Sequence, residues 1–339
     1  MRKVLLGSTG MEVSVVGFGG IPIQRVDQEE AAKIIIEVKN RGINFIDTAQ
    51  AYTVSEEYIG SALKEAGREN FYIATKAMVY DYEKMKDAIE KSLKTMELDY
   101  IDLYQVHNVS KQEQLELTLS ENGALKALIE AKADGLIKHI GITGHIREIL
   151  MQAIEHDEFE TIQFPFNPVE SQGVELFTKA LEKGIGTIAM KPMAGGAFSK
   201  QKLSLKYIIN SNLINVAIPG MDSIEQVVEN ASVGERMEVL TLQEQEELNK
   251  EIEILGNDFC RRCGYCKPCP EGIDIPNVFI AEGYVIRYNL PDYGKSKYDA
   301  LPVKATSCVR CRKCERKCPY NLPIVNKLKH AVETFKSIE

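Results

Sequence analysis

Eight short apolar segments alternate with amphipathic helical segments over the first 235 residues of this 339-residue chain. The strand candidates, in order, read SVVGFG, INFID, FYIATK, IDLYQVH, HIGIT, TIQFPF, GTIAMK and INVAIPG. The helical segments between them are Gln28–Asn40, Ser55–Ala66, Lys84–Met96, Ala124–Lys132, Ile146–Glu155, Val174–Lys183, Leu203–Asn210 and Ile224–Ala231. Eight strand–helix units of this length predict an α/β fold, a (β/α)8 TIM barrel, rather than an open sheet.

The segments outside this repeat predict the rest of the architecture. The opening KVLLGSTGMEVSV reads as an N-terminal β-hairpin that closes the bottom of the barrel. We therefore expect the barrel at residues 1–235. A helical connector is expected at 236–255, where TLQEQEELNKEIEIL is found, and a small, mostly helical domain at 256–339.

Composition excludes several classes of protein. Hydrophobic residues make up 44% and charged residues 27%, as in ordinary soluble domains. The longest apolar runs are too short to cross a bilayer, and the N-terminus has no signal-peptide core, so we expect a cytoplasmic protein without a membrane partner. Basic residues of the C-terminal part interleave with cysteines rather than forming a stripe, which argues against a nucleic-acid partner.

All eight cysteines fall in two runs, CRRCGYCKPCP at 260–270 and CVRCRKCERKCP at 308–319. Four closely spaced thiolates followed by proline are typical of a ligand run for an iron–sulfur cluster, so we predict two [4Fe-4S] clusters. Disulfides do not suit a reducing compartment, whereas structural zinc is the better alternative.

The fourth cysteine of such a run binds the other cluster in two-cluster ferredoxins. One predicted ligand set is therefore Cys260, Cys263, Cys266 and Cys318. The other is Cys308, Cys311, Cys314 and Cys269. The spacer between the runs contains IPNVFIAEGYVIRYNL, a helical stretch that suits a helical ferredoxin-like domain better than the compact βαβ ferredoxin.

Eight cations flank the cysteines: Arg261, Arg262, Lys267, Arg310, Arg312, Lys313, Arg316 and Lys317. They either balance the charge of reduced clusters and dock an acidic electron carrier, or form an ordinary solvated surface.

Active sites of TIM barrels lie at the C-terminal ends of the strands. Those ends carry Asp47, Lys76 and His107, and Tyr52 follows in the loop after Asp47. Individually they could be a helix cap, a solvated strand end, a loop histidine and rim packing. Together they suit carbonyl reduction, in which Tyr52 donates a proton, Lys76 lowers the pKa of Tyr52, Asp47 holds Lys76, and His107 orients the carbonyl.

Four segments carry a resemblance to a known family: GINFIDTAQAYTVSEEYIGSALK, FYIATK, LDYIDLYQVHN and IKHIGITGH. They resemble the signatures of the aldo-keto reductase superfamily, and that family's catalytic tetrad falls on Tyr52, Lys76, Asp47 and His107. With its cysteine-rich tail, the chain is similar to the ferredoxin-fused aldo-keto reductases of anaerobic bacteria and archaea.

The resemblance implies an oxidoreductase that binds NAD(P)H over the barrel mouth. Gln163 is expected to bind the carboxamide with help from Thr143, and Met190 stands where an aromatic ring usually stacks on the nicotinamide. Gly144 replaces the usual carboxamide-binding asparagine, and His145 is a candidate substitute. Lys191, Gly195 and Gly196 are expected to meet the pyrophosphate.

The segment IPGMDSIEQVVEN resembles the loop that binds the adenosine side of the cofactor, so Gly220, Ser223, Glu229 and Asn230 are expected there. Gly220 and Gln226 replace the lysine and arginine that commonly grip the 2′-phosphate of NADP. Without these two cations the phosphate loses its charge-assisted partners, which favours NADH over NADPH.

Three functions fit these features. The first is reduction of an aldehyde or ketone with NAD(P)H, with clusters that exchange electrons with a ferredoxin or flavodoxin-type partner or that serve regulation or structure. Hydride transfer moves two electrons and a cluster one, so flavin is a possible bridge. The second function is therefore a cluster-driven reductase whose barrel binds flavin or another acceptor. The third is an electron-transfer protein with a non-catalytic barrel. The substrate and the oligomeric state stay open.

Overall fold

The computed structural model describes residues 1–236 and 238–338. The chain divides into two compact units that are not consecutive in sequence. The first consists of residues 1–192 and 202–240, and the second of residues 193–201 and those from 241 onward.

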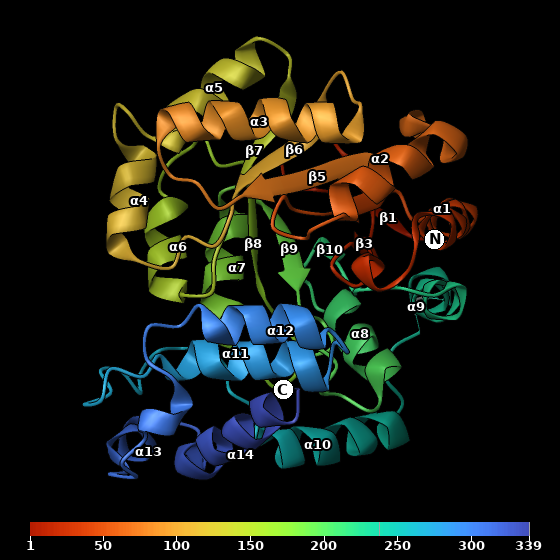
Figure 1. Ribbon diagram of the computed structural model, residues 1–339. Helices are drawn as coiled ribbons and strands as arrows, with labels where there is room; N and C mark the ends of the chain where they lie inside the picture. Colours follow the sequence, from red (N-terminus) through yellow and green to blue (C-terminus); the bar gives the residue numbers. More distant parts are fainter. Residues whose placement is uncertain (237, 339) are drawn as a thin grey trace. The chain divides into compact units, whose positions relative to one another are not determined.

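Eight parallel strands form the centre of the first unit, each hydrogen-bonded to the next in chain order (Figure 1). They are β3 (Phe18–Gly19), β4 (Phe45–Asp47), β5 (Tyr72–Ala77), β6 (Ile101–Val106), β7 (Ile137–Thr143), β8 (Thr161–Pro165), β9 (Gly186–Met190) and β10 (Val216–Ala217). Parallel bridges from Val16 to Ala217 and from Gly19 to Gly220 join the first and last strands. The sheet therefore closes on itself, and the predicted barrel is confirmed.

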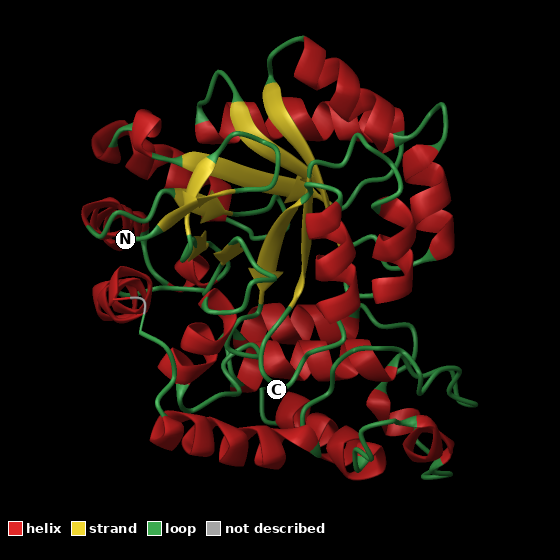
Figure 2. Cartoon of the chain, turned by 180° about the vertical axis from the view of Figure 1, so that it is seen from behind, coloured by secondary structure: helices red, strands yellow, loops and turns green. Residues whose placement is uncertain are grey.

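Helices surround these strands, as the view from behind shows (Figure 2). They are α1 (Gln28–Asn40), α2 (Ser55–Ala66), α3 (Tyr82–Met96), α4 (Gln112–Leu119), α5 (Ala124–Ala133), α6 (Arg147–Ala153), α7 (Val174–Glu182), α8 (Gln201–Ile209) and α9 (Ile224–Arg236). Short 3-10 turns lie at η1 (Pro22–Arg25) and η2 (Arg68–Asn70).

Helix α1 shows why these segments are helical. The side chain of Asp27 accepts a hydrogen bond from the backbone N–H of Glu30 and so caps the helix start. Its buried residues are Ala31, Ile34, Ile35 and Val38. This spacing places one apolar stripe against the barrel, while the charged residues face outward.

Helix α4 was not predicted from sequence. It buries only Leu115 and Thr118, so its apolar periodicity is weak. Its start is fixed by Gln114, whose side-chain oxygen accepts hydrogen bonds from the backbone N–H groups of Ser110 and Lys111.

The predicted N-terminal hairpin is present as antiparallel β1 (Lys3–Leu5) and β2 (Glu12–Ser14). Leu6, Met11 and Val13 from this region pack in one buried cluster with the strand residues Phe45 and Leu103. The hairpin thereby buries apolar side chains of the barrel interior.

The second unit is mostly helical, as predicted. Its elements are α10 (Leu242–Gly256), α11 (Ile275–Ile286), α12 (Pro291–Asp299), η3 (Ala305–Ser307), α13 (Lys313–Lys317) and α14 (Ile324–Lys336). Its core joins α11, α12 and α14, where the ring of Tyr298 stacks on that of Phe335 at 3.9 Å. Among the described residues, no helix has both the length and the apolar character needed to cross a membrane.

Residues 193–201, which follow β9, belong to this second unit. The guanidinium of Arg287 donates a hydrogen bond from Nε to the carbonyl of Gly195 at 3.1 Å. The carboxylate of Glu251 accepts one from the backbone N–H of Ser199. The domain limits expected at 235/236 and 255/256 remain predictions.

Candidate active site and cluster-binding cysteines

Three neighbouring strands bring the predicted catalytic residues to one end of the barrel. Asp47 ends β4, Lys76 lies near the end of β5, and His107 directly follows β6. Successive side chains of a strand point to opposite faces. Thr75 accordingly donates to Glu56 of α2 outside the sheet, whereas Lys76 points inward to Asp47.

Lys76 and Asp47 form a buried ion pair. The ammonium nitrogen lies 2.6 Å from Asp47 Oδ2 and 2.8 Å from the carbonyl oxygen of Thr48. Lys76 is 1% and Asp47 2% exposed. Burial raises the pKa of Asp47 and lowers the pKa of Lys76, and the attraction between the two charges opposes both shifts.

Tyr52 and His107 complete the group of four. The Lys76 ammonium is 5.2 Å from the centre of the Tyr52 ring. The Tyr52 and His107 rings meet edge to face, with their centres 6.0 Å apart. Both residues are half-buried, whereas Lys76 and Asp47 are buried. The structure brings the four residues together, and their catalytic roles remain predictions.

Gln105 is a site residue that sequence reasoning missed. It is fully buried on β6, opposite Lys76 of β5, and its Nε2 donates to Asp47 Oδ1 at 3.3 Å. Asp47 therefore accepts hydrogen bonds from Lys76, Gln105 and Gln163, and all three lower its pKa. The available signal was spacing, because Gln105 lies two residues before His107 and so faces the same side of the strand.

Glu56 was also missed. It is buried in α2 and accepts hydrogen bonds from Thr75 and, at 2.8 Å, from the hydroxyl of Ser92. Burial raises the pKa of Glu56. When ionised, its charge favours the protonated form of Lys76. An acidic residue in the first turn of a helix gave no sequence signal, because such residues are common there.

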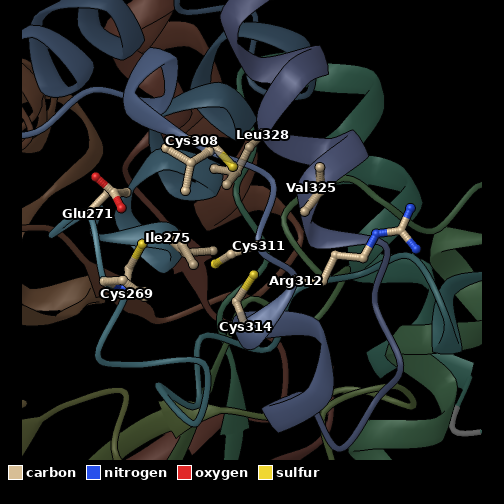
Figure 3. Close-up of a pocket in the computed structure, with 11 residues that line it drawn as sticks. Cys269, Glu271, Ile275, Cys308, Cys311, Arg312, Cys314, Val325 and Leu328 are labelled. Atoms are coloured by element: carbon tan, nitrogen blue, oxygen red, sulfur yellow. The ribbon is translucent and has the colours of Figure 1, made fainter.

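In the second unit, one pocket is lined by four cysteines from both runs, namely Cys269, Cys308, Cys311 and Cys314 (Figure 3). This is the set predicted to bind a single cluster. Ile275, Val325 and Leu328 line the same pocket and give it an apolar wall. Cys311 is exposed, whereas Cys314 is buried.

Three members of the other predicted set, Cys260, Cys266 and Cys318, belong to or pack against the core cluster of this unit. Burial, together with the charges of Cys260, Cys263 and Cys314, raises the pKa of the Cys266 thiol to about 12. Burial likewise raises the pKa of Cys263, and the charge of Cys318 adds to the shift. Cys266 and Cys314 are the two buried cysteines, and both belong to the core of this unit. Cys266 belongs to the first predicted set, and Cys314 belongs to the second.

The two runs share a backbone pattern. Arg262 and Gly264 flank Cys263 with positive φ angles of 59° and 79°, and Arg310 and Arg312 flank Cys311 with φ angles of 57°. Left-handed residues at these places turn the chain between successive cysteines. Such a conformation costs a residue other than glycine about 1 kcal/mol.

Among residues 1–236 and 238–338, no three His, Cys, Asp or Glu side chains converge on a position for a single metal ion. A cubane cluster does not need such a position, because each cysteine binds a different iron. Eight thiols in two groups fit two clusters by number and donor type.

The family model that describes the aldo/keto reductase family matches residues 15–205, more than half of the chain. The chain belongs to the aldo/keto reductase family. A second model, described as a 4Fe-4S dicluster domain, matches residues 259–323, which contain all eight cysteines. The protein is thus an aldo/keto reductase with a C-terminal dicluster domain.

Known proteins agree with this membership. L-galactose dehydrogenase of Arabidopsis thaliana is 28% identical over 300 residues, which cover 74% of this chain and 93% of that protein. The holo form of aldo-keto reductase AKR11C1 from Bacillus halodurans has a TM-score of 0.66 and 25% identity, over 74% of this chain and 96% of that one. An aldo-keto reductase from Klebsiella pneumoniae, solved with NADPH, shares the fold with a TM-score of 0.63 and 22% identity; the match covers 74% of this chain and 95% of that one.

The structure explains one departure of this aldo/keto reductase from the expected pattern. A Cβ atom at Gly144 would lie 2.5 Å from the carbonyl oxygen of Val109. An asparagine therefore does not fit at this position unless the backbone moves. The neighbouring Thr143 is buried, and its hydroxyl accepts a hydrogen bond from the N–H of Asn108.

Gln163, expected to bind the carboxamide, lies on β8 opposite Thr143 of β7 and is 1% exposed. Its Oε1 atom is buried and has no hydrogen-bond partner among the described residues. A buried acceptor without a partner is unfavourable, and an amide N–H donor, such as that of the nicotinamide carboxamide, would satisfy it. Met190 is half-buried and packs against the apolar cluster of the barrel.

The expected adenosine loop has no room for a lysine at Gly220, because a Cβ there would lie 2.5 Å from the Pro22 ring. Gln226 instead accepts a hydrogen bond from the N–H of Asp222. Asp222 pairs with Arg25 at 2.8 Å, an ion pair that sequence reasoning missed. The hydroxyl of Ser223 accepts a hydrogen bond from the N–H of Gln226 at the start of α9.

The remaining residues predicted to bind the cofactor differ in their solvent exposure, and they do not all belong to the same structural unit. Lys191 has a positive φ of 55° directly after β9. Gly195 and Gly196 also have positive φ angles, and they belong to the second unit. On α9, Glu229 is exposed and pairs with Lys202, whereas Asn230 is buried. All of these contacts with a nucleotide remain predictions.

Proposed function

We propose that this protein is a carbonyl oxidoreductase that uses NAD(P)H and holds two [4Fe-4S] clusters for electron exchange with a redox partner. The observation that supports the catalytic part is the convergence of Tyr52 and His107 on the buried Lys76–Asp47 pair. A lone tyrosine or histidine at a barrel rim has many uses. A tyrosine beside a buried ammonium and an edge-on histidine suits proton transfer to a carbonyl oxygen.

Each residue has a separate part in the proposed reaction. When bound, the nicotinamide would supply a hydride to the carbonyl carbon. The hydroxyl of Tyr52 gives its proton to the carbonyl oxygen, and the product is an alcohol. The positive charge of Lys76 stabilises the phenolate that Tyr52 leaves behind. Asp47, held by Gln105, keeps that charge in place, and His107 orients the carbonyl.

We further propose that NADH is the preferred reductant. Gly220 and Gln226 offer no cation for a 2′-phosphate, and Asp222 places a carboxylate beside them. The guanidinium of Arg25, which lies beside this loop, is already paired with Asp222 rather than offered to a 2′-phosphate. The related Klebsiella pneumoniae protein was solved with NADPH, so the family itself does not decide this preference.

In the second unit, the proposed clusters supply one-electron chemistry. The cysteines assigned to them are Cys260, Cys263, Cys266 and Cys318 for one, and Cys269, Cys308, Cys311 and Cys314 for the other. The pocket lined by Cys269, Cys308, Cys311 and Cys314 supports the second of these sets. The effect of neighbouring thiols on the pKa values of Cys263 and Cys266 supports the first.

Replacement of Tyr52 tests the catalytic proposal. Tyr52→Phe should lower the reduction of a panel of aldehydes and ketones by a factor of about 100 or more, because the proton donor is lost. Iron content and nucleotide binding should not change. Tyr82→Phe is the matched control, since its hydroxyl contacts Glu130 on the outer helices. Full activity of Tyr52→Phe would exclude this mechanism.

A second measurement addresses the cluster-driven alternative. The visible absorbance of the anaerobic protein is followed while NADH, and then NADPH, is added. Bleaching would mean that hydride equivalents reach the clusters, so that a mediator such as flavin should be sought. Constant absorbance, with nucleotide binding shown by fluorescence, would mean that the clusters either depend on an outside electron partner or have a structural role.

A further inference from the structure

The cysteine pocket of the second unit has one side open to solvent. Cys311 is exposed, and Val309 beside it is an apolar side chain that is 61% exposed. Residues 309–313 are all exposed, as are Arg316 and Lys317. The first cysteine run differs, because Arg261 and Arg262 are buried there.

The charge around this open side is strongly positive. Five of the nine residues from 309 to 317 are cations, namely Arg310, Arg312, Lys313, Arg316 and Lys317. The single acid, Glu315, accepts a hydrogen bond from the N–H of Val325 and lies 3.8 Å from Arg312. No described acidic side chain forms an ion pair with Arg310, Lys313 or Arg316.

The backbone conformation of Arg312 is energetically unfavourable for a residue other than glycine. Arg312 has a left-handed backbone, and the equivalent residue of the first run is Gly264, which takes that conformation without strain. Its side chain is 72% exposed and points away from the sulfur atoms (Figure 3). The local backbone does not explain an arginine here, and its ion pair with Glu315 is long at 3.8 Å and leaves most of the side chain exposed.

The opposite side of the same pocket leads inward. Cys314 is buried in the core of the unit together with Cys266, a member of the other predicted set. The pocket that opens at Cys311 therefore adjoins, through Cys314, the core cluster that also contains Cys266.

We propose that Val309 and the five surrounding cations form the docking surface for an acidic one-electron carrier protein, and that electrons cross at the site of Cys269, Cys308, Cys311 and Cys314. An apolar centre with a charged rim is the usual composition of such transient interfaces. In each encounter one electron crosses, so that one partner is oxidised and the other reduced, and no bond forms or breaks. This inference rests on the proposed clusters and names the class of partner.

Binding is tested with the intact, cluster-loaded protein and an acidic plant-type ferredoxin in which gallium replaces iron. This probe docks but transfers no electrons, so the readout is independent of activity. We expect binding in calorimetry that weakens steeply with added salt. A basic cytochrome c should not bind.

The variants separate charge from structure. Arg312→Gly adopts the backbone of the first run, and we expect iron content to stay the same while the carrier binds several-fold more weakly. Arg310→Gln/Arg312→Gly/Arg316→Gln should weaken binding about tenfold or more at low salt. Lys250→Gln, which removes one charge from α10 of the same unit, should have no effect.

The outcomes distinguish this inference from the proposed function. A protein without iron would contradict the proposed clusters. Full iron content with no salt-sensitive binding of the ferredoxin would overturn the docking surface alone, as would unchanged binding in the Arg312→Gly and triple variants. If the triple variant loses iron, Arg312→Gly decides the question.

Discussion

The ammonium of Lys76 and the carboxylate of Asp47 lie 2.6 Å apart in a part of the barrel that water does not reach. Removing two charges from water is costly, and their attraction often fails to compensate for that cost. A buried ion pair is therefore weak evidence for stability. Its position beside Tyr52 agrees with the catalytic role that we propose for it.

Asp47→Asn should both destabilise the barrel and abolish activity. The substitution leaves the Lys76 ammonium buried without its counter-charge, which costs about 3–5 kcal/mol of unfolding free energy. Anaerobic urea denaturation measures this loss.

The control is Glu97→Gln, which breaks the exposed Lys64–Glu97 pair and should change stability by less than about 1 kcal/mol. Asp47→Asn combined with Lys76→Met should recover part of the stability but no activity. Equal stability of Asp47→Asn and the wild type would contradict the buried-pair interpretation.

Asp222→Ala should shift the cofactor preference toward NADPH. The substitution removes a carboxylate next to the expected 2′-phosphate position and releases Arg25 from its ion pair. We expect the ratio of kcat/KM for NADPH to that for NADH to rise about tenfold, equivalent to about 1.4 kcal/mol.

Steady-state kinetics with both nucleotides gives this ratio. Asp157→Ala removes the same charge from an exposed loop before β8, at the other end of the barrel strands, and should leave the ratio unchanged. A constant ratio in Asp222→Ala would place the adenosine end of the cofactor elsewhere.

Paired cysteine substitutions test the ligand sets. Cys269→Ser/Cys311→Ser should retain about four irons per chain, because both residues belong to the same set, whereas Cys266→Ser/Cys269→Ser should retain almost none. Iron and acid-labile sulfide analysis of anaerobically purified protein measures both. The reverse result would mean that each run binds its own cluster.

Much of the barrel followed from periodicity alone. The bounds predicted for the helices at 28–40 and 55–66 are those of α1 and α2, because each has a clear apolar stripe. Helix α12 was missed for the opposite reason. It starts at a proline, is polar throughout, and buries only Gly294 and Tyr298, so no period is visible in its sequence.

The site was predicted only in part, because strand ends locate residues but not their long-range partners. Strand order placed Asp47, Lys76 and His107 at one mouth. The contact of Gln105 with Asp47 depends on side-chain direction inside a closed barrel. The crowding of Gly144 by Val109 depends on the path of a loop.

Because residues 193–201 belong to the second unit, the two units cannot be expressed separately by cutting the chain at one position. The chain passes from the first unit to the second twice and returns once, so the two are interleaved rather than joined end to end. A fragment cut after residue 240 would keep Gly195 and Ser199 but lose Arg287 and Glu251, which bond to them. The cysteine-containing unit therefore cannot be removed at a single cut without affecting the rest of the chain. A protein shortened to its barrel would keep the loop at 193–201 without the hydrogen bonds that hold it.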